Sequence, residues 1–133
     1  MTASEPNVPR VPMLGEEEAR VIGKDNGVPS TMSGLNVFRI MSRHPTLAGV
    51  VAKQLAMLLY RGNMLDDRLR ELIIMRIGWR TGAMYEWTQH WPVALRVGLT
   101  EDETLAVRDP EKATCLGAAE RAVITATDDV LDN

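Results

Sequence analysis

Apolar side chains recur at helical spacing through most of this chain of 133 residues. Pro45 suits the first turn of a helix, and apolar positions follow it at intervals of three and four. Residues 68–80 are apolar on nearly every side, which is typical of a central, buried helix. Further helices are predicted from within residues 82–91 to Gly98, and over residues 116–131. The positions that define the first helix are Leu47, Val50, Val51, Leu55, Leu58 and Leu59.

Residues that favour helix starts lie ahead of several of these stretches. Ser33 is a plausible N-cap for a short helix over residues 35–43, because a serine oxygen can accept from a free backbone N–H. Asp66 or Asp67 can cap the helix over residues 68–80 in the same way.

Helix ends are also marked. Gly62 and Gly82 break the first and second long helices. Thr100 and Glu103 have the spacing of a capping box, so a short helix should begin there. The EEEARVIG stretch, residues 16–23, predicts one or two helical turns.

No stretch alternates as a strand would, and the pattern predicts an all-α protein, a compact helical bundle. Residues 1–15 are rich in proline and lack periodicity, so we expect a flexible N-terminal arm. Residues 16–133 are then a single helical domain. The chain ends at Asp132-Asn133 with acidic residues in its final turn, where a helix dipole prefers cations, so a C-terminally shortened form of a longer protein is one interpretation.

Bulk composition excludes few function classes. Hydrophobic residues make up 45% and charged residues 25%, as in ordinary globular domains. The net charge of −3 gives no reason to expect nucleic acid as a partner. No apolar run approaches the roughly 18 residues that span a bilayer, so no membrane partner is expected. The N-terminus lacks a signal pattern, and a cytoplasmic location is expected.

Sulfur and metal chemistry find little support in the sequence. Cys115 is the one cysteine, so it has no partner for an internal disulfide, and a buried or half-buried thiol is expected. His44 and His90 lie far apart, and no spacing typical of a metal site occurs. We assign His44 a local packing or capping role and expect neither metal nor cofactor.

The stretch GAMYEWTQHW, residues 82–91, concentrates the candidate chemistry. Glu86 and His90 are four positions apart, so a helix places them on one face. A carboxylate beside an imidazole can determine which ring nitrogen carries the proton, as a general acid or base requires. Tyr85 could donate a hydrogen bond to a developing oxyanion, and Trp87 could exclude water or stack on a flat substrate.

The residues of this stretch also have purely structural interpretations. A Glu–His pair at this spacing is often only a weak support for the helix. Trp91 and Trp79 are expected to be packing residues, in the core or at an interface. Pro92 predicts a bend or a late helix start, because it lacks the N–H that would bond to the Thr88 carbonyl.

Glu71 is a further candidate, since a charge is costly among its apolar neighbours unless it is paired. One interpretation is a salt bridge with Arg68. The functional alternative has Glu71 facing the next helix and hydrogen-bonded to His90, directly or through water. Arg76 and Arg80 follow on the same helix and could hold a substrate carboxylate.

The run from Asn36 to Glu103 resembles the carboxymuconolactone decarboxylase family, which includes the alkylhydroperoxidase D-like proteins. The resemblance lies in NVFRIMSRHP and in LDDRLRELIIMRIGWRTGAMYEWTQHWPVALRVGLTEDE. It implies an all-helical fold built on a helical hairpin. It also implies homo-oligomers, often trimers or hexamers, with sites near the contacts between subunits.

The thiol-peroxidase branch of this family carries a glutamate, a CxxC pair and a histidine. The resemblance aligns Glu71 with the glutamate and His90 with the histidine. The cysteine positions fall on Ala83 and Glu86, and Cys115 lies outside the motif. Because disulfide cycling needs two sulfurs, this departure argues against a dithiol peroxidase.

The decarboxylase branch acts on a carboxylated lactone, and the resemblance implies a cofactor-free lyase or isomerase for a small molecule of that type. His90, Tyr85 or a protonated glutamate, such as Glu86 or Glu71, could supply the proton. Arg76, Arg80 and Trp87 are the candidate substrate-binding residues.

Two alternatives remain open from the sequence. One is a non-catalytic oligomeric helical module, in which the aromatic-rich stretch is interface or core, with Trp87 and Trp91 as anchors between subunits. The other is a thiol peroxidase that uses Cys115.

Overall fold

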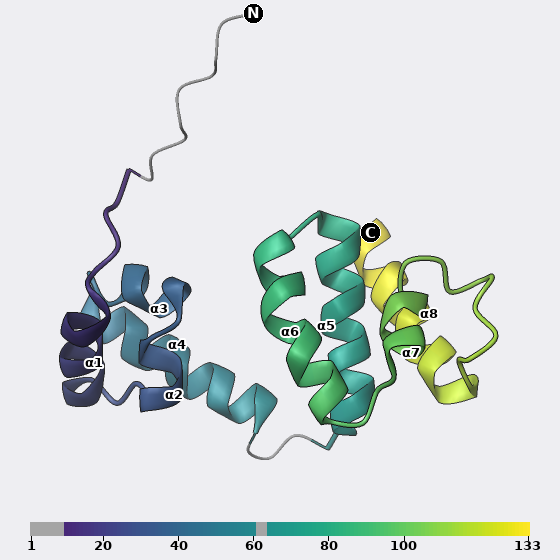
Figure 1. Cartoon of the computed structure of the whole chain (residues 1–133), viewed down its shortest axis with the longest axis horizontal. Helices are drawn as coiled ribbons and strands as arrows, with labels where there is room; N and C mark the ends of the chain where they lie inside the picture. The colour runs from purple at the N-terminus through teal and green to yellow at the C-terminus, as the bar shows by residue number, and fades with distance from the viewer. Residues whose placement is uncertain (1–9, 61–63) are drawn as a thin grey trace, which may run out of the picture. The chain divides into compact units, whose positions relative to one another are not determined.

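The computed structural model describes residues 10–60 and 64–133 (Figure 1). Within these ranges the secondary structure is eight α-helices, with no strand, so the all-α fold class is confirmed. The chain divides into two compact units, Met1–Asn63 and Met64–Asn133, and each is described by itself. One domain over residues 16–133 stays a prediction.

Four helices form the first unit: α1 (Glu16–Asp25), α2 (Ser30–Ser33), α3 (Asn36–Met41) and α4 (Pro45–Leu59). Pro45 occupies the first turn of α4 as predicted, and the preceding His44 caps this helix by accepting from Leu47 N–H. Apolar side chains from the loop after α1 and from α2, α3 and α4 form the core of this unit. They are Val28, Met32, Phe38, Ala48 and Ala52.

The prediction that Ser33 caps the following helix is wrong. Ser33 is the last residue of α2, and its hydroxyl donates to the Ser30 carbonyl. Leu35 occupies the N-cap of α3 and makes no side-chain cap. Serine can also bond backwards within a turn, and here it does so while buried.

The predicted arm lies only partly within the residues that the structure describes, and the predicted break at Gly62 lies outside them. Residues 1–9 of the arm also lie outside them. Near the end of the predicted arm, Leu14 is buried. Its backbone N–H donates to the Arg39 carbonyl, and the Arg39 side chain donates to the Leu14 carbonyl, so this part of the segment is attached to α3.

The second unit contains α5 (Asp67–Thr81), α6 (Met84–Arg96), α7 (Glu101–Ala106) and α8 (Ala118–Asp132). Figure 1 shows α5 between α6 and α8, which agrees with its packing against both helices. The central, buried position predicted for residues 68–80 is therefore confirmed. The core around α5 contains Leu72, Met75, Ala94, Leu99, Val107, Leu116 and Ile124.

The helix-end signals of this unit act as predicted. Asp66 accepts from the N–H groups of Arg68 and Leu69 at the start of α5. Gly82 ends the helix at φ 66°, a left-handed conformation that glycine adopts without strain. Thr100 and Glu103 form the capping box of α7. The Thr100 hydroxyl accepts from the Glu103 N–H, and the Glu103 carboxylate accepts from the Thr100 N–H.

Pro92 does not delay the start of α6. The helix begins at Met84 and continues through Pro92 to Arg96, so the alternative of a late start is wrong. Pro92 is exposed, which is where a missing backbone donor costs least. The predicted bend stays a prediction.

Candidate functional site

Glu71 lies on the side of α5 that faces α6, and its side chain is only 1% exposed. His90 lies on the facing side of α6 with 19% of its side chain exposed. Their atoms Oε2 and Nδ1 are 2.7 Å apart. The hydrogen bond predicted between these two residues is confirmed, and it is direct.

Arg70 compensates the buried charge of Glu71. Its guanidinium donates to Oε1 of Glu71 at 3.1 Å and also contacts Asp67, and its own side chain is 9% exposed. The two oxygens of Glu71 therefore have different partners, Arg70 on Oε1 and His90 on Oε2. A buried carboxylate is tolerated when it is paired and hydrogen-bonded in this way.

Arg70 was not predicted from the sequence as a partner for Glu71, for which only Arg68 was named. The proposed Arg68 salt bridge is wrong: Arg68 pairs instead with Glu103 at 2.7 Å. A signal was present, because a buried glutamate requires a nearby cation and Arg70 is adjacent. Which way the Arg70 side chain points depends on how α5 packs, and the spacing of residues alone does not predict this.

The contact with Glu71 determines the tautomer of His90. An ionised carboxylate only accepts hydrogen bonds, so the shared hydrogen lies on Nδ1. In the neutral ring Nε2 then carries a lone pair. Arg70, Glu71 and His90 thus form a chain of hydrogen-bonded groups that ends at a nitrogen able to accept a proton.

Glu86 lies on the same face of α6 as His90, as the spacing predicted. Its Oε2 is 3.7 Å from Nε2 of His90, and its side chain is 52% exposed. This distance is too long for a hydrogen bond. Glu86 therefore contacts the ring as a solvated charge, and only when the ring is protonated does an ion pair result.

Tyr85 does not lie beside the Glu71–His90 pair. Five positions along α6 correspond to a rotation of about 140° from His90, and the Tyr85 side chain is exposed. Within the described part of the chain, no hydrogen bond joins Tyr85 to Glu71 or His90.

The three tryptophans pack in sequence against one another. Trp79 and Trp87 have ring centroids 5.9 Å apart, and so do Trp87 and Trp91. Trp87 and Trp91 lie against the core of the second unit, so the expectation of core packing is confirmed for Trp91. Trp79 is 44% exposed, so it packs on Trp87 at the surface and not in the core, and packing at an interface stays a prediction.

Arg76 and Arg80, the predicted carboxylate holders, already have carboxylate partners. Arg76 donates from Nε and Nη2 to both oxygens of Asp128 at 2.7 Å, and Arg80 donates to Asp128 and Asp132. Hydrogen bonds from Arg76 hold the pKa of Asp128 below its usual value. A substrate carboxylate would have to compete with Asp128 for these guanidinium groups.

The expectation of a buried or half-buried thiol is wrong, because Cys115 is exposed in the loop before α8. Its loop is separate in sequence from Ala83 and Glu86, the two aligned cysteine positions. Among the described residues, no group of three or more histidine, cysteine, aspartate or glutamate side chains could hold a metal ion.

In the same ranges, none of the helices has the length and apolar character needed to cross a bilayer.

The second unit is thus all-helical and holds a part-buried Glu–His pair between two antiparallel helices. Residues 48–129 match the model of the carboxymuconolactone decarboxylase family. This match covers more than half of the chain, and the chain belongs to that family. Comparisons with curated proteins and with solved structures gave no match.

Proposed function

We propose that the protein is a cofactor-free proton-transfer enzyme that decarboxylates or isomerises a small carboxylated or lactone-like substrate. The observation that carries this proposal is the 2.7 Å contact between Glu71 and Nδ1 of His90. It leaves Nε2 of a partly exposed imidazole available for protons. Membership of the carboxymuconolactone decarboxylase family supports the same class of reaction.

His90 is the proposed acid and base. For decarboxylation, the bond to the carboxyl group breaks, its electron pair enters an enolate, and CO2 leaves. The Nε2–H of a protonated His90 then delivers a proton to the carbon, and the ring regains one from solvent. For isomerisation, neutral Nε2 removes a proton from a carbon beside the carbonyl and returns it at another carbon.

Glu71 acts on this chemistry through His90. The hydrogen bond to Nδ1 keeps Nε2 directed away from α5, and the carboxylate stays fixed because Arg70 holds its other oxygen. Orientation of a catalytic ring by a buried carboxylate is a recurring arrangement in enzymes. Glu86 would act only as a nearby charge, and Tyr85 has no part in this proposal.

The decisive experiment measures turnover, or exchange of substrate hydrogen with deuterium from D2O, on a panel of lactone acids. General acid–base catalysis contributes about 10²–10⁴-fold, so His90→Gln should lose at least roughly a hundredfold in kcat/KM. Gln89→Ala, which changes the neighbouring side chain on α6, is the matched control. Equal rates for the wild type and His90→Gln would contradict the proposal.

A thiol peroxidase is the weaker alternative, because the aligned cysteine positions hold Ala83 and Glu86. Peroxide consumption that is abolished by Cys115→Ser, with no effect of His90→Gln, would favour it over the proposal above.

We also propose that the chain assembles as a homo-oligomer, a trimer or a hexamer. Support comes from an apolar hollow of about 280 Å³ between α5 and α8. Ile77, Val130 and Leu131 line it and are exposed. Light scattering should give a multiple of the 14.8 kDa chain mass. Ile77→Glu should lower this mass, whereas Val21→Glu, at an exposed apolar position of α1, should not; a monomeric wild type would contradict the proposal.

A non-catalytic helical module would show such assembly without turnover of any substrate. The packing of Trp87 and Trp91 against the core is compatible with that alternative. Loss of oligomerisation without loss of turnover in Ile77→Glu would separate the two properties.

A further inference from the structure

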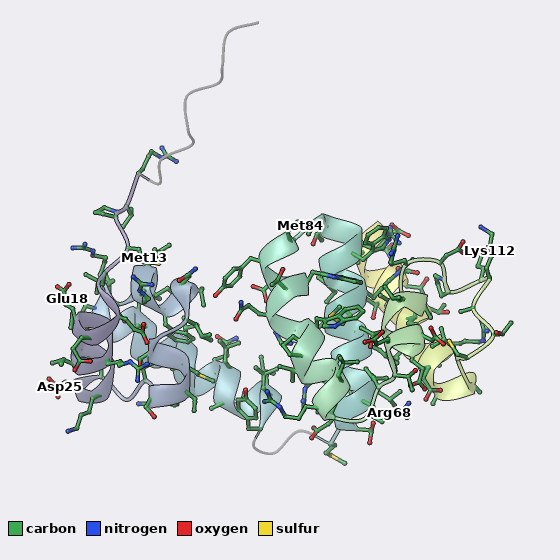
Figure 2. The ribbon with its side chains drawn as sticks, viewed as in Figure 1. Met13, Glu18, Asp25, Arg68, Met84 and Lys112 are labelled. Carbon is green, nitrogen blue, oxygen red and sulfur yellow. The ribbon has the colours of Figure 1, made fainter. Side chains whose placement is uncertain are left out.

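A hollow of about 620 Å³ lies beside the tryptophans of the second unit. Trp79, Trp87 and Trp91 line it together with Met84 and Leu105, so most of its surface is apolar. Figure 2 shows Met84 at the start of α6, at the opposite end of the α5–α6 pair from Arg68. Pockets of this size and character are typical of sites for small ligands.

Arg108 is the one charged residue in this lining. Its guanidinium carbon lies 4.6 Å from the centroid of the Trp79 ring, a cation–π contact that holds the group at the hollow. It follows α7 and is exposed to solvent. The hollow therefore combines three indole rings with a single positive charge.

The bonding of Arg108 differs from that of most other arginines in this unit. Arg70, Arg76 and Arg80 have carboxylate partners, and Arg121 donates to three backbone carbonyls. Within residues 10–60 and 64–133, by contrast, the guanidinium of Arg108 makes neither a hydrogen bond nor an ion pair. Its donors are thus available to a ligand.

Two acidic residues line an adjoining hollow that Arg108 also borders, namely Asp102 and Asp109. Asp109 is paired with Lys112 at 2.6 Å, and this hydrogen bond lowers the pKa of Asp109. Neither carboxylate lines the tryptophan hollow. A negative ligand group placed there would meet Arg108 first.

We propose that this hollow binds a flat, unsaturated ring that carries one carboxylate. The ring would lie against the indoles, which favour offset or edge-to-face contacts with other rings. The carboxylate would accept from Arg108, whose planar donors match its two oxygens. The hollow is lined by neither Glu71 nor His90, so binding there can be tested apart from the proposed proton transfer.

The three indoles also provide the assay, since Trp79, Trp87 and Trp91 are all the tryptophans of the chain. Cinnamate is added to ¹⁵N-labelled protein while the three indole N–H signals are followed by NMR. Cinnamyl alcohol serves as the neutral ligand of the same skeleton, and cyclohexanecarboxylate as an anion without a flat ring. Cinnamate should shift the indole signals and bind at least about tenfold more tightly than either, as expected for a charge-assisted contact joined to ring stacking.

Variants of single residues test each part of the site. Arg108→Gln should weaken cinnamate by about tenfold and leave cinnamyl alcohol within about twofold. Arg96→Gln, at another exposed arginine of this unit, should leave both unchanged. Trp79→Leu should weaken both aromatic ligands, because it removes an exposed wall of the hollow.

Two results would overturn the proposal. One is equal affinity for cinnamate and cinnamyl alcohol, which would remove the role of Arg108. The other is an absence of shifts in all three indole signals at saturating cinnamate, which would place any binding elsewhere. Neither result depends on turnover, so the proton-transfer proposal can fail or succeed separately.

Discussion

The two sides of α5 carry charged side chains in different ways. On the side facing α8, Arg76 and Arg80 donate to Asp128 and Asp132, so each guanidinium ends on a carboxylate. On the side facing α6, the chain of contacts runs from Arg70 through Glu71 and ends at His90, whose Nε2 has no hydrogen-bond partner within the described residues.

This difference separates a structural ion-pair network from a candidate catalytic one. A closed network holds helices together, because each charged group in it already has a partner of opposite charge. An open one ends at a group that can exchange a proton with a substrate. The acidic last turn of α8, which seemed unfavourable for the helix dipole, also has its cations: they come from α5.

The largest effect should come from breaking the closed side. Asp128→Ala leaves the buried guanidinium of Arg76 without its carboxylate, and loss of one partner of a buried pair costs about 3–5 kcal/mol. Urea denaturation should show this decrease in the free energy of unfolding. Asp129→Ala, at the exposed neighbouring position, should change it by less than about 0.5 kcal/mol. Similar values for the two variants would show that the α8 side is not a closed network.

On the open side, activity should change more than stability. Glu71→Gln keeps the shape of the side chain but removes the negative charge that orients His90. We expect kcat/KM on the responsive substrate to fall about a hundredfold, which corresponds to about 2.7 kcal/mol in transition-state stabilisation.

The control for this variant is Glu101→Gln, in the exposed first turn of α7. Its kcat/KM should equal that of the wild type. If Glu71→Gln unfolds the protein while the folded fraction keeps full activity, then Glu71 is structural and the contrast between the two sides of α5 disappears.

Local signals in the sequence predicted much of the second unit. The Asp66 cap, the capping box at Thr100 and the break at Gly82 each depend on a few neighbouring residues, and all three are present. The contact between Glu71 and His90 was also predictable, because a charge in an apolar stretch needs a partner. Ser33 shows the limit: the same hydroxyl can bond forwards as a cap or backwards within a turn.

The pairings across helices could not be predicted in the same way. Arg76 and Asp128 are 52 positions apart, and nothing in the local pattern links them. Their contact depends on the packing of α8 against α5, as the Arg70 contact depends on the rotation of α5. The tryptophan hollow likewise results from three side chains that the helix packing brings to one place.

Acid should weaken the closed side by a smaller amount than mutation does. Since the folded pKa of Asp128 is lowered from its usual 3.8, its ionised form stabilises the fold. This contribution is fully present above the unfolded pKa and is lost as pH falls through the lower folded pKa. The Asp128→Asn variant lacks this stabilising contribution at every pH. The difference in unfolding free energy between wild type and variant should therefore shrink in acid; a constant difference would contradict the role of the Asp128 charge.

The smallest effect should come from Glu86, and it gives the finest test of the open side. Its carboxylate lies 3.7 Å from Nε2 and is half exposed, so water screens it and no hydrogen bond fixes it. Glu86→Gln should change kcat/KM by less than about threefold, consistent with a solvated ion pair. A loss as large as that of Glu71→Gln, measured on the same substrate, would mean that Nε2 is not free. The chain of contacts would then continue to Glu86, and the open side of α5 would be as closed as the side facing α8.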